Sequence, residues 1–364
     1  MKGNSEFDRD HIIEGFWIYI VQGEDMLLDV EKELKRHMKY TERYNKGENM
    51  QKVRKIIIGI AGAVVISYII SAVYAKCRYS ASLSEREPSG KSVCIYEDGQ
   101  YELIDVEDHI ETILLGVMQD NWSDEMLKTM AVILRTGMYY QMESKNMSQA
   151  GNTNLINESE LREIRYTYDE LRQMWGDGYK DAVQRSRSAV LDTRGVVIRY
   201  DGEVILPVYH IVSVGHTVSA EELYGYDIPY LRQVDSDADR IAPEFSTTEM
   251  FSEDRLRKIF DRWLDKNAEE GNGKVCVLRA TESGFAKTIS VFGREIDAED
   301  FCRQLGLASA NVHIDRPGDD YRVITIGVGN SLGMSLYGAE ILAANGESYD
   351  EIIRYYYTGV TVSK

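Results

Sequence analysis

The stretch Gly116–Met126 contains the residue types that acid–base chemistry uses, at a turn that precedes a helix. An apolar run ends there and is followed by Asp120, Asn121 and Ser123, after which a second apolar segment begins. A turn of this kind can hold one carboxylate where it gives and takes a proton. Asp120 and Glu125 supply carboxylates here, whereas the amide of Asn121 cannot exchange a proton at neutral pH.

The other residues able to bind a metal or act as nucleophiles are histidines and cysteines. His210 and His216 lie six residues apart without further ligands nearby, which does not make a zinc site. The four cysteines form no CxxC pair; they are Cys77, Cys94, Cys276 and Cys302. The sequence therefore predicts no metal and no cofactor. It allows a disulfide outside the cell and favours unpaired thiols at least as much.

Composition limits the classes of partner. The chain has 364 residues with 42 Lys and Arg against 60 Asp and Glu, a formal charge of -18. Binding to nucleic acid requires clustered positive charge, so this composition argues against it.

One segment predicts a membrane anchor. Residues 56–75 form a run of 20 residues without a charge, and a helix of about that length spans the hydrocarbon core of a bilayer. Basic residues are more frequent before the run than after it, which places the N-terminus in the cytoplasm. We therefore expect a basic, amphipathic cytoplasmic region (1–55), a single-pass span (56–75), a polar linker (76–92) and an exported domain at the cell surface (93–364).

The exported domain must position these residues with a mixture of helices and hairpins. Residues 93–105 alternate like a hairpin, and Asp201-Gly202 lies between two β-branched runs at a tight turn. Helices are expected over 106–115, 126–140, 159–164, 180–192, 251–267, 297–305 and 336–345, with a loop over 144–159. Because helices and strands do not alternate regularly, the expected class is α+β with antiparallel hairpins.

Several separated motifs resemble the stage II sporulation protein D family. LLGVMQDNWSDEMLKTMAVILRT is similar to its G-V-V-x-x-E turn followed by an L-K-x-x-A-V-x-x-R-T helix. TRGVVIRYDGEVILPVYHIVSVGHT, IPYLRQVDSDAD, VFGREIDAEDFCRQLGL and GVGNSLGMSLYGAEILAANGESYDEIIRYYYTG match later segments of the family in order. The resemblance covers roughly residues 110–362.

The resemblance implies an activity on peptidoglycan. Active members resemble lytic transglycosylases, which cleave the MurNAc–GlcNAc bond and leave a 1,6-anhydro end. One carboxyl group suffices: it protonates the leaving oxygen and then takes a proton from the C6 hydroxyl that attacks C1. The implied partners are glycan strands of peptidoglycan, and a cell-wall amidase or other engulfment proteins.

The resemblance also locates the site. The catalytic Glu of the family falls on Asn121, in a turn shorter than usual, and Asp120 and Glu125 are the substitutes nearest to it. Asn330 replaces a family histidine, and Leu336 replaces a glutamine. Substrate contacts are expected from Arg135, His210, Ser213, His216, Asn330, Ser335 and Tyr337.

Three functions follow from this pattern. One is a pseudoenzyme that holds glycan or recruits an amidase, because the amide of Asn121 cannot replace the acid; weak activity belongs to the same hypothesis. A second is an active transglycosylase that uses a displaced carboxylate, Asp120 or Glu125. A third is a signalling protein whose cytoplasmic helix reports contact with the wall. Whether the chain is an enzyme stays open at this point.

Overall fold

A computed structural model describes residues 89–97, 100–148, 155–158, 161, 165–262 and 274–364. These residues belong to one compact unit, Pro88–Lys364. The predicted cytoplasmic region, membrane span and most of the linker lie outside the described residues, so they stay predictions. Within the described ranges no helix is both long enough and apolar enough to cross a bilayer.

A small sheet and a helix open the unit. Strands β1 (Ser92–Glu97) and β2 (Gln100–Asp105) pair antiparallel, as the alternating pattern predicted, and β3 (Leu155–Asn157) pairs parallel with β1. Helix α3 (Val106–Val117) follows at once, because the Asp105 side chain accepts a hydrogen bond from the Glu107 backbone nitrogen and caps the first turn.

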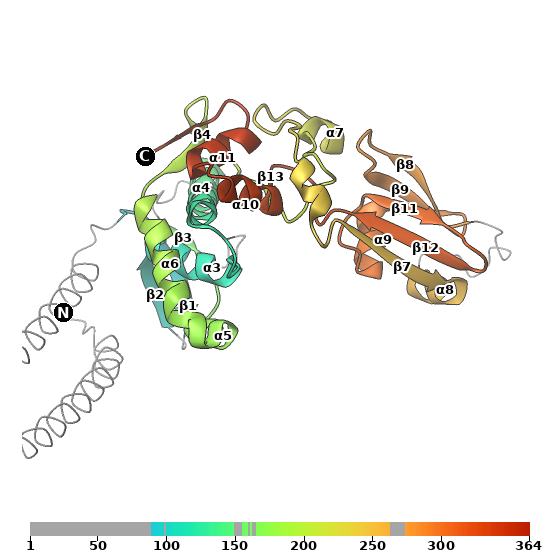
Figure 1. Ribbon diagram of the computed structural model, residues 1–364, viewed down its shortest axis with the longest axis horizontal. Helices are drawn as coiled ribbons and strands as arrows, with labels where there is room; N and C mark the ends of the chain where they lie inside the picture. Colours follow the sequence, from blue (N-terminus) through green and yellow to red (C-terminus); the bar gives the residue numbers. More distant parts are fainter. Residues whose placement is uncertain (1–88, 98–99, 149–154, 159–160, 162–164, 263–273) are drawn as a thin grey trace, which may run out of the picture. The chain divides into compact units, whose positions relative to one another are not determined.

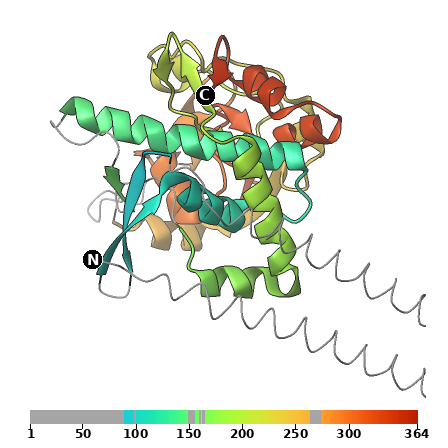
Figure 2. The same cartoon turned by 90° about the vertical axis from the view of Figure 1, so that its left-hand side faces the viewer.

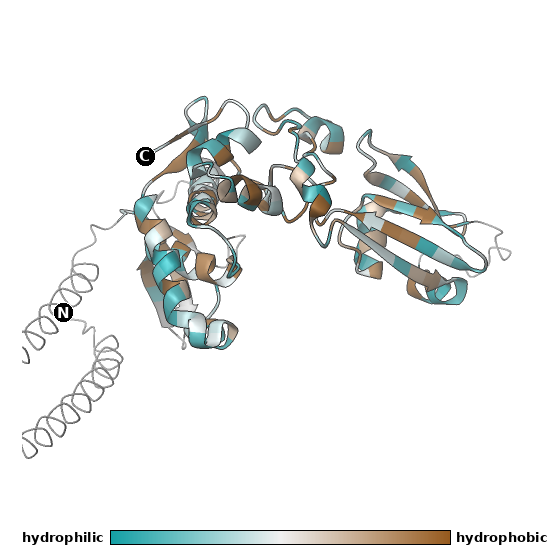
Figure 3. Cartoon of the chain, in the orientation of Figure 1, coloured by the Kyte–Doolittle hydropathy of each residue, from teal (hydrophilic) through white to brown (hydrophobic). Residues whose placement is uncertain are grey.

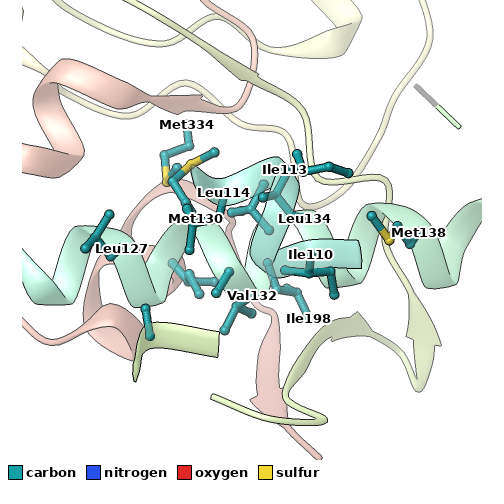
Figure 4. Close-up of a cluster of buried hydrophobic side chains, with 14 of the residues drawn as sticks. Ile110, Ile113, Leu114, Leu127, Met130, Val132, Leu134, Met138, Ile198 and Met334 are labelled. Carbon is teal, nitrogen blue, oxygen red and sulfur yellow. The ribbon is translucent and has the colours of Figure 1, made fainter. Parts of the chain in front are cut away.

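Long helices build the main core. Helix α4 (Asp124–Ser148) contacts α3 and α6 (Tyr179–Asp192), and Figure 2 shows α4 crossing α6. Helix α5 (Tyr168–Trp175) begins with a capping box formed by Thr167 and Glu170. Apolar side chains of α3 and α4 interlock in Figure 4, where Met334 joins them from the C-terminal part of the chain.

Three short pairings attach the later segments to this core. Strands β4 (Val197–Tyr200), β5 (Glu203–Val204) and β14 (Thr361–Ser363) form one sheet, and β6 (Tyr209–His210) pairs parallel with β13 (Met334–Ser335). The predicted hairpin at Asp201-Gly202 is confirmed, with φ of 49° and 86° at its two turn residues. Helices α10 (Leu336–Ala344) and α11 (Tyr349–Tyr356) pack onto α4.

A second, smaller core lies among strands of the region 246–326 (Figure 1). Its two sheets have the orders β11-β12-β7 and β10-β9-β8. Along β12 buried and more exposed residues alternate. Figure 3 shows hydrophobic and hydrophilic residues along the strands of this region. The elements here are β7 (Ser246–Ser252), α8 (Glu253–Phe260), β8 (Cys276–Ala280), β9 (Ala286–Val291), β10 (Arg294–Asp297), α9 (Ala298–Leu305), β11 (Val312–Asp315) and β12 (Asp320–Ile326).

The expected α+β class with antiparallel hairpins is confirmed, and two boundaries are corrected. The loop expected over 144–159 begins later, because α4 continues to Ser148, and it contains β3. The helix expected over 251–267 is α8, which starts at Glu253 and ends at Phe260. Its start is later because Phe251 pairs in β7 with Tyr321 and its ring fills the second core. The helix expected over 159–164 falls mostly outside the described residues. Cys94, Cys276 and Cys302 are unpaired, and Cys77 lies outside the described ranges.

Candidate functional site

The turn between α3 and α4 is tight. The Trp122 backbone nitrogen donates to the Gln119 carbonyl oxygen at 3.1 Å, which closes a β-turn with Asp120 and Asn121 at its two central positions. Both side chains are exposed, whereas Trp122 is buried in the main core. Asp120, one of the two candidate acids, and Asn121, at the position of the family's Glu, therefore lie at the tip of a turn whose next residue, Trp122, is anchored in the core.

Arg185 of α6 holds the same turn from the side. Its guanidinium donates to the Asp120 carbonyl oxygen at 3.0 Å and to the Trp122 carbonyl oxygen, and it lies 3.7 Å from the Asp124 carboxylate. These contacts use the backbone of Asp120, so its carboxyl group is not part of them.

Glu125 is engaged in packing between helices. Its carboxylate accepts from the Lys128 ammonium at 2.8 Å and from the Tyr349 backbone nitrogen, the first residue of α11, also at 2.8 Å. Partial burial opposes ionisation of Glu125, but the two hydrogen bonds outweigh it and lower its pKa below the usual value. A general acid needs the opposite shift, so this position disfavours Glu125 as the displaced acid.

A carboxylate that the sequence did not predict reaches the turn from α10. Glu340 Oε2 accepts from both the backbone nitrogen (2.9 Å) and the hydroxyl (3.0 Å) of Ser123, the residue that precedes α4. Ser123 in turn caps α4 by accepting from the Met126 backbone nitrogen. Glu340 is the only charged residue of α10, whose sequence is LYGAEILAA. A single charge in an otherwise uncharged helix was the feature of the sequence that could have identified Glu340.

A second unpredicted carboxylate, Asp239, organises two of the expected substrate contacts. It is fully buried in the short 3₁₀ helix η3 (Asp237–Ile241). Its oxygens accept from the Ser213 backbone nitrogen at 2.9 Å and from the Ser335 hydroxyl at 2.8 Å. Ser213 and Ser335 are themselves fully buried, and Ser335 caps α10. Both serines thus support the loops here and do not face solvent.

His210 lies next to this cluster. It pairs with Ser335 across β6 and β13, and its Nδ1 lies 3.0 Å from the Leu332 carbonyl oxygen, so Nδ1 carries the proton. Burial lowers the pKa of His210 to about 4, although the Leu332 carbonyl and Asp239 both favour the charged form. Its Nε2 is buried and without a hydrogen-bond partner among the described residues. His210 is thus a neutral histidine at neutral pH.

His216, Asn330 and Tyr337 occupy more open positions. His216 Nε2 lies 3.2 Å from the Ser283 hydroxyl. The Asn330 side chain is exposed and donates to the Tyr224 hydroxyl at 3.3 Å. Tyr337 is half-buried, and its backbone nitrogen donates to the Ile211 carbonyl oxygen. These positions fit contact with a ligand better than those of the buried serines.

Arg135 has a structural role, which corrects the expected substrate contact. Its side chain is fully buried and forms a two-point ion pair with Glu107, with distances of 2.9 and 2.6 Å. The remaining N–H groups donate to Thr193 and to the carbonyl oxygens of Val190 and Val196. All five donors of the guanidinium are thereby used inside the protein.

Helix α10 connects the two groups of residues. Ser335 at its N-terminus belongs to the Asp239 cluster, and Glu340 holds the turn that carries Asp120 and Asn121. Five residues correspond to about 7.5 Å along a helix axis. The structure thus brings His210, Ser213 and Ser335 together, whereas the side chains of Asp120 and Asn121 form no hydrogen bond to them within the described ranges.

Comparisons with known proteins agree with these motifs. Residues 97–200 match the family model described as stage II sporulation protein. The chain is 28% identical to the stage II sporulation protein D of Bacillus subtilis (strain 168), over 72% of this chain and 76% of that protein. It is 27% identical to the protein of the same name from Bacillus amyloliquefaciens, over 75% and 79%.

A more distant relative carries a different name. The amidase enhancer of Bacillus subtilis (strain 168) is 22% identical, over 70% of this chain and 40% of that protein. The predicted resemblance is therefore confirmed, and the chain is related to the stage II sporulation protein D family.

Proposed function

We propose that this protein binds the glycan strands of peptidoglycan during sporulation and cleaves them slowly or not at all. The observation that carries this proposal is the turn: Asn121, where the resemblance places the catalytic acid, is an amide at an exposed β-turn position. Loss of general acid–base catalysis lowers a rate by a factor of about 10²–10⁴.

The rest of the site supports binding. The framework that carries the motifs is intact: Asp239 holds Ser213 and Ser335, and Glu340 and Arg185 hold the turn. Such a network keeps the loops in one arrangement whether or not a proton is transferred. A protein with this framework and without the acid can retain affinity for glycan after losing the reaction.

The test is an assay of the full chain, in detergent, on purified peptidoglycan. We expect the chain to sediment with peptidoglycan and to release few or no 1,6-anhydro muropeptides. Asn121→Glu should raise their yield, and Asp124→Glu in the same region is the matched control that should not. Failure of the wild-type chain to bind peptidoglycan would contradict the proposal.

A second candidate is an active transglycosylase that uses Asp120. Its side chain is exposed, and Arg185 contacts only its backbone oxygen. If wild-type protein releases 1,6-anhydro muropeptides at a rate that Asn121→Glu does not raise, and Asp120→Asn abolishes the release, this candidate replaces the first. The similarity to an amidase enhancer favours a third, the stimulation of a cell-wall amidase, which adding the chain to an amidase assay would reveal.

The same proposal places the protein in the cell membrane, with residues 56–75 as a single span and residues 93–364 outside the cytoplasm. The support is the uncharged run of 20 residues and its basic N-terminal flank. Protease added to intact cells whose outer wall has been removed should digest the C-terminal part and spare the N-terminal region. The reverse pattern would show the opposite orientation.

A further inference from the structure

Two exposed tyrosines lie side by side next to the motif loop 329–333. Helix α7 (Ala220–Tyr224) ends at Gly225, whose φ of +79° turns the chain back so that Tyr226 returns beside Tyr224. The two rings are nearly parallel, at an interplanar angle of 20° and a centroid distance of 5.9 Å. They remain 47% and 57% exposed. Adjacent exposed aromatic rings form a contiguous apolar surface, and tyrosine is enriched at binding interfaces.

Helix α7, which carries Tyr224, is held in place by contacts within the protein. Ser219 caps α7 by accepting from the Glu222 backbone nitrogen. The Glu222 carboxylate then accepts from the backbone nitrogen and hydroxyl of Ser283, at 2.7 and 3.1 Å. Lys287 donates to the Glu222 carbonyl oxygen at 3.1 Å. These contacts with a neighbouring hairpin reduce the ordering cost that a mobile α7 would add to binding.

Asn330 supplies a polar group of fixed orientation at the edge of the rings. Its Oδ1 accepts from the Leu332 backbone nitrogen at 3.0 Å, which identifies the oxygen, and its Nδ2 donates to the Tyr224 hydroxyl. An amide nitrogen has two hydrogens, and the Tyr224 hydroxyl that accepts one of them keeps its own proton. One N–H of Asn330 and the O–H of Tyr224 are therefore directed by the structure and available to a ligand.

We infer that Tyr224, Tyr226 and Asn330 form a subsite for one N-acetylated hexose of a glycan strand. A pyranose ring presents a C–H face that can stack on an aromatic ring, while its hydroxyl and acetamido groups need donors and acceptors at the rim. The formal charge of the chain, -18, disfavours a polyanion as the occupant. This inference rests on the proposed function, since it names the part of the surface that holds the sugar.

Binding of an uncharged chitin oligosaccharide to the full chain in detergent tests the subsite. We expect Tyr224→Ala and Tyr226→Ala each to weaken binding about tenfold or more, because each removes one stacking face. Tyr226→Phe keeps the ring and should bind nearly as wild type. Tyr168→Ala is the matched control, because Tyr168 is also 57% exposed but lies on α5. Since all three tyrosines are exposed, none of these variants should change the melting temperature.

The outcomes separate the subsite from the proposed function. If wild-type protein binds peptidoglycan and the oligosaccharide, and both alanine variants bind them equally well, the subsite is refuted while the proposed function stands. The ring pair would then serve another partner, such as a protein. If wild-type protein binds the oligosaccharide through Tyr224 and Tyr226 but does not bind peptidoglycan, the subsite is supported and the proposed function fails.

Discussion

Replacing Arg135 tests whether this motif residue serves the core or the substrate. In Arg135→Met the Glu107 carboxylate, 3% exposed, would keep the Gly195 backbone nitrogen at 3.2 Å as its one hydrogen-bond donor among the described residues. Removing one partner of a buried ion pair typically costs about 3–5 kcal/mol. At about 2–4 °C per kcal/mol for a chain of this size class, the melting temperature should fall by roughly 6–20 °C.

The assay is thermal unfolding of the full chain in detergent, followed by tryptophan fluorescence. Arg187→Met is the matched control, because the Arg187–Glu111 pair at 3.1 Å is partly exposed and such pairs contribute about 1 kcal/mol or less. The double variant Glu107→Leu/Arg135→Met should recover part of the loss, since no buried charge is left alone. An Arg135→Met protein with an unchanged melting temperature and lost peptidoglycan binding would refute the structural role.

Three further perturbations follow from the described contacts. Burial lowers the pKa of both His109 and His210 to about 4. The stability that depends on their neutral forms is therefore present above pH 6.5 and is lost as pH falls towards 4, and the shift corresponds to about 3 kcal/mol for each. His109→Phe should reduce this acid sensitivity in urea unfolding curves measured over a series of pH values. Gly333→Ala should lower the free energy of unfolding by more than about 2 kcal/mol, because the φ of Gly333 is +72° and an added Cβ would lie 1.9 Å from a backbone oxygen. Gly137→Ala within α4 is the control in the same experiment. The nearest contact of its added Cβ is at 3.8 Å, so this variant should be neutral or stabilising by up to about 1 kcal/mol. Glu125→Gln should lower stability by about 1 kcal/mol and leave any residual muropeptide release unchanged; a variant that abolished release while keeping its melting temperature would make Glu125 the acid.

Local signals in the sequence predicted most of the fold. The Asp201-Gly202 hairpin and helix α9 depend on turn and cap residues that act within a few positions, so the pattern contained the information. The start expected for helix α8, at Phe251, was wrong because that residue pairs with a strand 70 residues later. Pairing of distant segments overrides local preference and leaves no local signal.

The site was harder to predict for the same reason. Asp239 and Glu340 act on residues 26 and 217 positions away, and only the folded chain reveals these contacts. Arg135 shows the converse difficulty. A match to a family motif indicates that the family has an arginine at this position. It does not indicate whether the arginine contacts a glycan or a buried glutamate. In the structure Arg135 contacts the buried Glu107.

The carboxylates around the turn differ in what they are free to do. The Glu125 carboxylate accepts hydrogen bonds from Lys128 and from the first backbone nitrogen of α11, and the Glu340 carboxylate accepts them from Ser123. Asp124 forms an ion pair with Arg185 at 3.7 Å. In the part of the chain that the structure describes, Asp120 is therefore the carboxylate of this turn whose side chain has neither a hydrogen bond nor an ion pair. Residual cleavage should therefore depend on Asp120 alone, whereas glycan binding should depend on residues outside the turn. A single substitution, Asp120→Asn, thus separates the two activities, because it removes the last candidate acid and retains the shape of the turn.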